Sequence, residues 1–346
     1  CYLRAWPSIV SREHAMLNQS LVYHDAAEKT DVLTVGSITL DHIFKLDRLP
    51  TTHFEANIDH IGTYFGGRAP NVAVMLAKLG FGSGIVSPVG SGFRESGYEA
   101  HLAKLGVNLQ GIVRVPSERM MEVWIHSDRR GNQTTVLNVA AARHFGKMHV
   151  PSALIKKSRI VHISSSGDYK FNVAVARSAV ELDVPVSFDV GNDPSTEISR
   201  YVSSMIRNST FVFVNNVELS GVLKRVALRS AHELLSIGPS TIVVMDKFDK
   251  SSWIYTNDGC KRIRSPLRKR KLVDNTGASD AYVAGFLAGQ LKGWCQDFRT
   301  CGLLGAAEAS FVTESLGCQT NLPSWEDLVR RIRVRFKCRI KSGCKD

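Results

Sequence analysis

The stretch DNTGASDAY, residues 274–282, places small residues between two aspartates and directly ahead of an apolar, helix-like run. Glycine and alanine let a backbone approach a ligand closely, and Asn and Thr favour a turn or a helix cap. The amides of residues 276–279 would then lie at a helix N-terminus, which attracts anions. We therefore predict an anion hole formed by Asn275, Thr276, Gly277, Ala278 and Ser279.

Asp280 falls in the first turn of that predicted helix. A carboxylate beside a bound phosphate would repel it, so phosphate binding does not explain this residue. A general base that takes the proton from a hydroxyl attacking the phosphate does explain it. The alternative is an acidic residue that only favours the helix dipole, and the motif alone does not separate the two interpretations.

A second stretch, GGRAPNVAVMLAKLG at 66–80, opens with two glycines and places an asparagine at the start of a helix. Gly66 and Gly67 let the chain pass under a ligand, and Asn71 offers both a donor and an acceptor to a hydroxyl. An ordinary loop followed by an ordinary helix start is the alternative. The two stretches together favour a site that handles a hydroxyl and a phosphate.

Short β-branched runs alternate with helix-like stretches along most of the chain. The strand-like runs are 31–44, 84–90, 160–166, 184–191, 210–216 and 240–246, and helix-like stretches include 71–80, 97–107 and 172–182. This alternation predicts an α/β fold with a mostly parallel sheet covered by helices on both faces. Such sheets bind ligands at the carboxyl ends of their strands.

Two segments, 56–65 and 121–139, instead alternate apolar and polar residues, and the second contains Arg-Gly-Asn at a hairpin tip. Strands with one wet face predict a small β-sheet lid, which we place at about 43–65 and 112–140. No internal repeat or low-complexity linker is present. We expect one main domain over 31–336, an N-terminal extension over 1–30 and a basic tail over 337–346.

The net charge of +12 gathers mainly in residues 261–271 and 330–345. Such charge suits an anionic partner, but no aromatic interleaving or nucleic-acid motif accompanies it, so we expect solvated surface instead. No window offers about 18 consecutive apolar residues, so a membrane span is not expected. The seven cysteines form no C-x-x-C pair, which disfavours a zinc site and fits a reducing cytoplasm.

Residues 66–80 and 274–287 together resemble the two signatures of the PfkB or ribokinase-like family of sugar and nucleoside kinases. The first reads G-G-x-small-x-N-x-small, and the second is similar to D-[ST]-x-G-A-G-D. The resemblance spans roughly residues 31–325. It implies a three-layer α/β/α sandwich with a β lid, ATP as the phosphate donor and Mg²⁺ as a helper. A monovalent cation such as K⁺ is a further expectation, held near Asp274 and the segment 309–323.

On the acceptor side, Asp41 matches the acidic residue that holds sugar hydroxyls, and Gly67 and Asn71 match sugar-contacting positions. Asp280 matches the base. The resemblance thus implies acceptor contacts from Thr39, Asp41, Gly66, Gly67, Asn71 and Asp168.

On the nucleotide side, Asn215 and Glu218 of NNVE match the pair that organises Mg²⁺ and its waters in this family. A helix cap with an acid in its first turn is the alternative for these two residues. Nucleotide contacts are expected from Asn215, Lys247, Gly277 and Cys318.

The sequence departs from the family pattern at two places. Ser279 stands where glycine is usual, and it would be strained if the position required a positive φ. Lys247 and Lys250 occupy the glycine positions of a T-x-G-x-x-G loop, where they could meet phosphates or block the nucleotide. These departures leave open a ligand-binding protein with reduced catalysis.

The lid and the end GCQTNLP look most like archaeal-type nucleoside kinases, so we favour a ribonucleoside acceptor over a free sugar. A base would need an apolar wall, for which the candidates are Phe44, Phe54, Tyr64, Trp124 and Tyr169. Whether ATP or ADP is the donor stays open. Lid strands in this family often pair between subunits, so a homodimer is expected. A dinucleotide oxidoreductase is disfavoured because no G-x-G-x-x-G follows the first strand.

Overall fold

The computed structural model describes residues 30–165, 167–191, 198–246, 251–264, 272–293 and 297–336. The main sheet contains β1 (Thr30–Val35), β4 (Ser83–Ser91), β5 (Asn108–Arg119), β8 (Ser158–Ser164), β9 (Val186–Asp189), β10 (Phe211–Asn215), β11 (Thr241–Met245), β12 (Ser252–Thr256) and β13 (Gly259–Ile263). The smaller sheet contains β2 (Thr39–Leu46), β3 (Ile58–Gly66), β6 (Met121–Asp128) and β7 (Gln133–Asn138).

The helices follow the same chain order. They are α1 (Arg68–Lys78), α2 (Tyr98–Lys104), α3 (Ser152–Lys156), α4 (Tyr169–Glu181), α5 (Ile198–Arg207), α6 (Asn216–Val226), α7 (Ala278–Leu291), α8 (Phe298–Val312) and α9 (Trp325–Phe336), with short 3₁₀ turns at Ala140–Lys147 and Glu233–Ile237.

The main sheet has the strand order β13-β12-β11-β10-β9-β8-β1-β4-β5. All pairings from β11 to β5 are parallel, and β12 and β13 add an antiparallel edge. The predicted mostly parallel α/β sheet is therefore confirmed. The antiparallel hairpin of β12 and β13, which has no crossover helix, was not predicted from the sequence.

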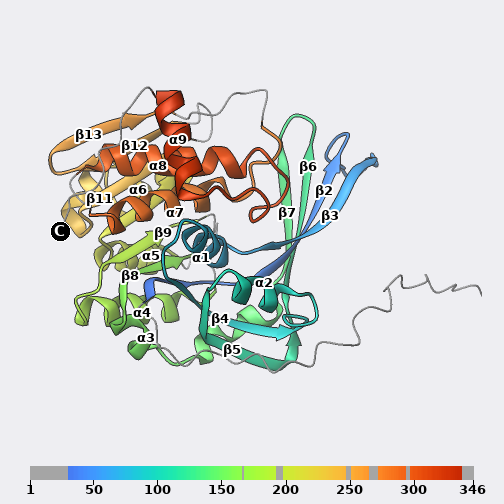
Figure 1. Cartoon of the computed structure of the whole chain (residues 1–346), viewed down its shortest axis with the longest axis horizontal. Helices are drawn as coiled ribbons and strands as arrows, with labels where there is room; N and C mark the ends of the chain where they lie inside the picture. Colours follow the sequence, from blue (N-terminus) through green and yellow to red (C-terminus); the bar gives the residue numbers. More distant parts are fainter. Residues whose placement is uncertain are drawn as a thin grey trace, which may run out of the picture.

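Helices cover both faces of this sheet, as Figure 1 shows. One core cluster joins α4, α5 and α6 to strand residues such as Phe188 and Val214. The other joins α1, α7, α8 and α9 to residues such as Phe213 and Val243. Nearly every residue of α7 from Asp280 to Leu291 is buried, because other elements surround this helix. The first turn of α7 is thereby held rigidly against the sheet.

The smaller sheet, with strand order β3-β2-β6-β7, stands beside the main body and forms the lid (Figure 1). Its hairpin tip at Arg130-Gly131-Asn132 lies between β6 and β7, as predicted. The lid bounds differ from the expected 43–65 and 112–140, because the lid strands span 39–66 and 121–138. Residues 112–119 belong instead to β5, which pairs in parallel with β4 of the main sheet.

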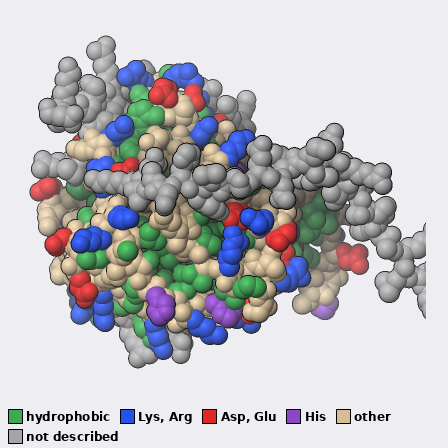
Figure 2. All heavy atoms as spheres, turned by 60° about the horizontal axis from the view of Figure 1, so that its bottom comes forward, with side chains coloured by type: hydrophobic (Ala, Val, Ile, Leu, Met, Phe, Trp, Pro, Cys, Tyr) green, Lys and Arg blue, Asp and Glu red, His purple; other side chains and the backbone are tan. Residues whose placement is uncertain are grey.

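The face drawn in Figure 2 does not gather its described charges into one patch. In Figure 2, Lys and Arg side chains are scattered among Asp, Glu and apolar side chains. The basic run at 265–271 and the tail at 337–346 lie outside the described residues, as does the extension 1–29. Among the described helices, none combines the length and apolar character that a membrane span requires.

Helices α7 and α8 pack closely against each other at two glycines, Gly285 and Gly305. A Cβ added at Gly285 would lie 2.6 Å from the carbonyl oxygen of Leu304, and one at Gly305 would lie 2.6 Å from that of Tyr282. Either glycine replaced by alanine should lower the free energy of unfolding by about 1–3 kcal/mol through overpacking. Denaturant titration of each variant measures this.

Gly221 in α6 provides the control, because among the described residues no atom outside the backbone of its own helix lies within 4 Å of an added Cβ. Gly221→Ala should leave stability unchanged or raise it by about 0.5–1 kcal/mol, as alanine favours a helix. Equal effects at all three glycines would contradict close packing of the α7–α8 contact.

Candidate active site

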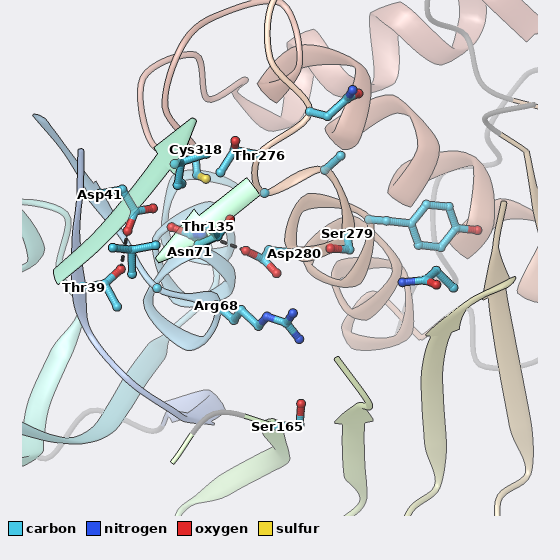
Figure 3. Close-up of a pocket in the computed structure, with 18 of the residues that line it drawn as sticks. Thr39, Asp41, Arg68, Asn71, Thr135, Ser165, Thr276, Ser279, Asp280 and Cys318 are labelled. Carbon is cyan, nitrogen blue, oxygen red and sulfur yellow. Dashed lines mark hydrogen bonds between the residues drawn. The ribbon is translucent and has the colours of Figure 1, made fainter. Parts of the chain in front are cut away.

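A cleft of about 1180 Å³ lies between the lid and the carboxyl edge of the main sheet. The lid contributes Thr39, Asp41 and Thr135 to its lining, and the main domain contributes the starts of α1 and α7. Figure 3 shows that Asp41, Asn71, Asp280 and Arg68 converge there from separate parts of the chain. The sequence motifs at 66–71 and 274–280 thus meet in one site.

The turn before α7 has a fixed shape. Gly277 adopts a left-handed φ of 75°, and a Cβ there would lie 2.5 Å from the Cys318 Sγ, so only glycine fits. Ser279, in contrast, lies inside the first turn of α7 and is not among the described residues with positive φ. The serine therefore carries no backbone strain, and this departure from the family pattern is compatible with an intact turn.

The amides of this turn divide into two groups. The Thr276 amide donates to the Asp274 carboxylate at 3.2 Å, and the Ala278 amide donates to the Asn275 carbonyl at 3.2 Å. Within the described ranges, the Gly277 and Ser279 amides have no acceptor in the protein. Two of the four amides at residues 276–279 thus hold the shape of the turn, and the other two are left for a ligand.

Asp280 is only 4% exposed and lines the cleft. The Asn71 Nδ2 donates a hydrogen bond to its Oδ2 at 2.7 Å. Burial raises the pKa of Asp280 to about 7, while the Arg68 guanidinium and the Asn71 hydrogen bond act to lower it. A carboxyl group with a pKa near neutrality can both accept and release a proton at physiological pH.

Asp41 lies on the lid side of the same cleft. The Thr39 hydroxyl donates to its Oδ1 at 2.6 Å, and burial raises the pKa of Asp41 to about 6. A Cβ at Gly66 would lie 2.0 Å from the Asp41 Oδ2, so only a residue without a side chain leaves room for this carboxylate. Gly67, with φ of 102°, is the N-cap of α1, and a Cβ there would lie 2.2 Å from the Ser37 carbonyl oxygen.

A hydrogen-bond network fixes the orientation of Asn71, and the sequence analysis missed it. The Gln319 Nε2 donates to the Asn71 Oδ1 at 2.9 Å and to the Tyr98 Oη at 2.7 Å, and the Tyr98 hydroxyl donates to the Gly66 carbonyl. These contacts direct the Asn71 amide nitrogen at Asp280. Gln319 belongs to the segment GCQTNLP, which had been noted only for its resemblance.

Arg68 is the second residue that the sequence analysis missed. Its Nη1 lies 3.6 Å from the Asp189 Oδ2, and its guanidinium also interacts electrostatically with Asp280 and Glu218. Figure 3 places its side chain in the cleft beside Asp280. The only sequence signal was the position of a basic residue directly after the two glycines.

Asn215 and Glu218, which the family resemblance assigns to Mg²⁺, form a capping box at the start of α6. The Asn215 Oδ1 accepts from the Val217 and Glu218 amides, and the Glu218 Oε2 accepts from the Asn215 amide at 2.8 Å. Asn215 also lines the cleft. No group of three or more His, Cys, Asp or Glu among the described residues could hold a metal ion. This donor set fits Mg²⁺ only through water and through a ligand's own phosphates.

The remaining candidates lie at the rim of the site or outside it. Asp168 lines the cleft while its Oδ1 caps α4 by accepting from the Phe171 amide. Among the aromatic candidates for a base wall, Tyr169 lines the cleft, whereas Trp124 stacks on His42 and Phe44 on His126. Lys247 and Lys250 lie outside the described residues.

Comparison with proteins of known sequence agrees with this geometry. Residues 29–325 match the model of the pfkB family of carbohydrate kinases. A nucleoside kinase of Methanocaldococcus jannaschii is 36% identical over 302 residues, which cover 87% of this chain and 96% of that protein. A nucleoside kinase of Methanothermobacter thermautotrophicus is 32% identical and covers 90% and 98%.

Solved structures are similar over the same range. The crystal structure of the Methanocaldococcus jannaschii nucleoside kinase superposes with a TM-score of 0.78 at 34% identity, covering 88% of this chain and 99% of that one. A Burkholderia thailandensis nucleoside kinase in complex with inosine gives 0.76 at 22% identity, covering 89% and 100%, and supports the fold alone. The chain belongs to the pfkB family of carbohydrate kinases.

Proposed function

We propose that this protein transfers the γ-phosphoryl group of ATP to a hydroxyl of a ribonucleoside, with Asp280 as the general base. The observation that carries the proposal is the position of Asp280. Its carboxylate lies buried in the cleft, beside the free amides of the anion-hole turn and facing the acceptor residues of the lid. A hydroxyl placed there would have a proton acceptor on one side and an electrophile on the other.

In this proposal each residue of the cleft has a separate role in phosphoryl transfer. Asp41 accepts hydrogen bonds from acceptor hydroxyls, and Thr39 holds that carboxylate in place. Asn71 orients Asp280, and the Gly277 and Ser279 amides stabilise charge that develops on the transferred group. Arg68 adds a positive charge beside the base. Mg²⁺ would be held by water near Asn215 and Glu218 and would neutralise phosphate charge when bound.

The lid favours a nucleoside over a free sugar. Its cleft-facing side carries Val123, Ile125 and Leu137 from β6 and β7, next to Val139. Leu137 is 54% exposed, so its apolar surface has no partner in the described protein large enough to bury it. A flat, apolar base could cover this surface while its ribose reached Asp41. In this proposal, an aliphatic wall of the lid would contact the base, together with Tyr169, the aromatic candidate that lines the cleft.

The role of Asp280 predicts a defined pH dependence. The base must be ionised, and its pKa in the free protein is about 7, so kcat/KM should rise with pH through a midpoint near 7. Asp280→Asn should lower kcat/KM by about 10²–10⁴-fold, because the amide cannot accept the proton. Steady-state assays of ADP formation with Mg-ATP and a panel of nucleosides and pentoses provide the measurement.

Arg68→Gln tests the electrostatic part of this scheme. The guanidinium lowers the pKa of Asp280, so its removal should move the midpoint of the pH profile to higher pH. A profile that keeps its midpoint would rule out a charge interaction between the two side chains. Full activity in Asp280→Asn with every acceptor would rule out the proposed base.

Leu137 tests the acceptor class. Leu137→Ala removes part of the apolar wall, so kcat/KM for adenosine or inosine should fall by about tenfold, in line with the loss of buried methyl groups. The value for ribose should change little, since ribose does not reach the wall. An equal decrease for both acceptors, or higher activity with ribose in the unsubstituted protein, would favour a free-sugar kinase.

We further propose that the lid's outer face pairs with a second copy of the chain. The face opposite the cleft carries Ile61 and Val136, which are 58% and 57% exposed, next to the stacked Trp124 and Phe44. Sedimentation should give a dimer, and the double variant Ile61→Asp, Val136→Asp should sediment as a monomer. A monomeric unsubstituted protein would contradict this proposal.

A further inference from the structure

The turn that forms the anion hole is tied to the rest of the protein through the Asp274 carboxylate. Its Oδ1 accepts from the Thr276 amide and from the Thr276 hydroxyl at 2.8 Å, and its Oδ2 accepts from the Gly317 amide at 3.3 Å. The Val273 and Asp274 amides both donate to the Thr313 carbonyl. Asp274 is 3% exposed, so its negative charge is buried between two chain segments.

A buried carboxylate of this kind is costly unless a positive charge lies nearby. The family resemblance leads to the expectation of a monovalent cation between these two segments. The described residues supply a different charge. The Lys45 Nζ, which extends from strand β2 of the lid, lies 3.7 Å from the Asp274 Oδ1 and donates to the Val273 carbonyl at 3.4 Å. The Lys45 side chain is 23% exposed, and it lines a small cleft with Asp274 and Asn275.

The chemistry of this donor set fits an ammonium group in place of a metal ion. Both Asp274 oxygens already accept hydrogen bonds, and a carbonyl oxygen completes the contacts of the lysine. A lysine ammonium is a compact single charge with three donors, and K⁺ is a single charge of similar size. The positive charge beside the turn at Asp274 is therefore supplied by Lys45 of the same chain.

We propose that Lys45 is a positioning residue, which completes the anion hole by placing its ammonium against Asp274 when the lid is in place. The inference rests on the proposed phosphotransfer function. Two consequences follow for this chain. The anion-hole turn needs no added monovalent cation, and the positive charge of Lys45 reaches the turn only when the lid is in place.

A second lid contact reaches the same turn. The Gln133 Nε2 on β7 donates to the Thr276 Oγ1 at 3.3 Å. Strands β2 and β7 are the second and fourth strands of the lid sheet, so contacts from separate strands meet on one turn. Because Asp41 lies on β2 together with Lys45, acceptor contact and charge delivery belong to the same strand. The lid thereby couples acceptor binding to the shape of the anion hole.

Lys45→Met removes the charge and keeps much of the length of the side chain. In buffers of constant ionic strength made with tetramethylammonium salts, kcat should fall by about tenfold or more, because misplaced groups at a reacting centre are costly. Added K⁺ or methylammonium should restore most of the loss. The unsubstituted protein and Lys45→Arg should respond to K⁺ by less than about twofold.

Arg48→Met is the matched control, since it removes another lid cation, one that donates to the Glu55 carbonyl away from the turn. It should neither lower kcat nor create a response to K⁺. A strong requirement for K⁺ in the unsubstituted protein would overturn the proposal. A loss in Lys45→Met that no cation restores would overturn it as well, since that result indicates simple packing of the lid.

Thermal unfolding provides a readout that does not depend on activity. K⁺, compared with tetramethylammonium at equal ionic strength, should raise the Tm of Lys45→Met but not that of the unsubstituted protein. Equal shifts in both proteins would overturn the proposal. Absence of turnover in the unsubstituted protein together with the expected Tm pattern would count against phosphotransfer and support the role of Lys45.

Discussion

The site depends on keeping a carboxylate buried and still able to ionise. Burial alone would hold the Asp280 proton too tightly for a base, and the Arg68 guanidinium and the Asn71 amide act against that effect. The chain Tyr98–Gln319–Asn71 then fixes which Asn71 atom meets the carboxylate. Asp280 lies in the first turn of α7, a largely apolar and buried helix. In this low-dielectric environment, each electrostatic contact of its carboxylate is stronger than it would be in water.

Close approach of backbone to side chain is the second constraint, and glycine meets it at two points. Gly66 leaves room for Asp41, and Gly277 leaves room for Cys318 while it turns the chain into α7. Gly66 lies at the end of lid strand β3, and Gly277 is the N-cap of the core helix α7. In the proposed reaction, main-chain packing at these two glycines would help to set the positions of Asp41 and of the turn before α7.

The sequence predicted the local parts of this architecture well. The parallel strands, the turn before α7 and the places of Asn71 and Asp280 near helix starts all follow from short patterns whose geometry is set within a few residues, while their roles remain a proposal. Arg68, Gln319 and Lys45 were missed because each acts on a partner far along the chain, such as Asp189 or Val273. The boundary between the lid and β5 was misplaced because residues 112–119 pair with β4, which lies far back along the chain, and their sequence alone does not say which sheet they join.

Asp41 lies on a lid strand and Asp280 lies on the main domain. This placement has a consequence for hydrolysis of the nucleotide by water. Without an alcohol held by Asp41, the base faces no aligned nucleophile except solvent. With one bound, the alcohol itself would take the place of that solvent beside Asp280. Under the proposed function, hydrolysis of the nucleotide would thus be opposed, because the strand that carries Asp41 would bind the acceptor and help to exclude water.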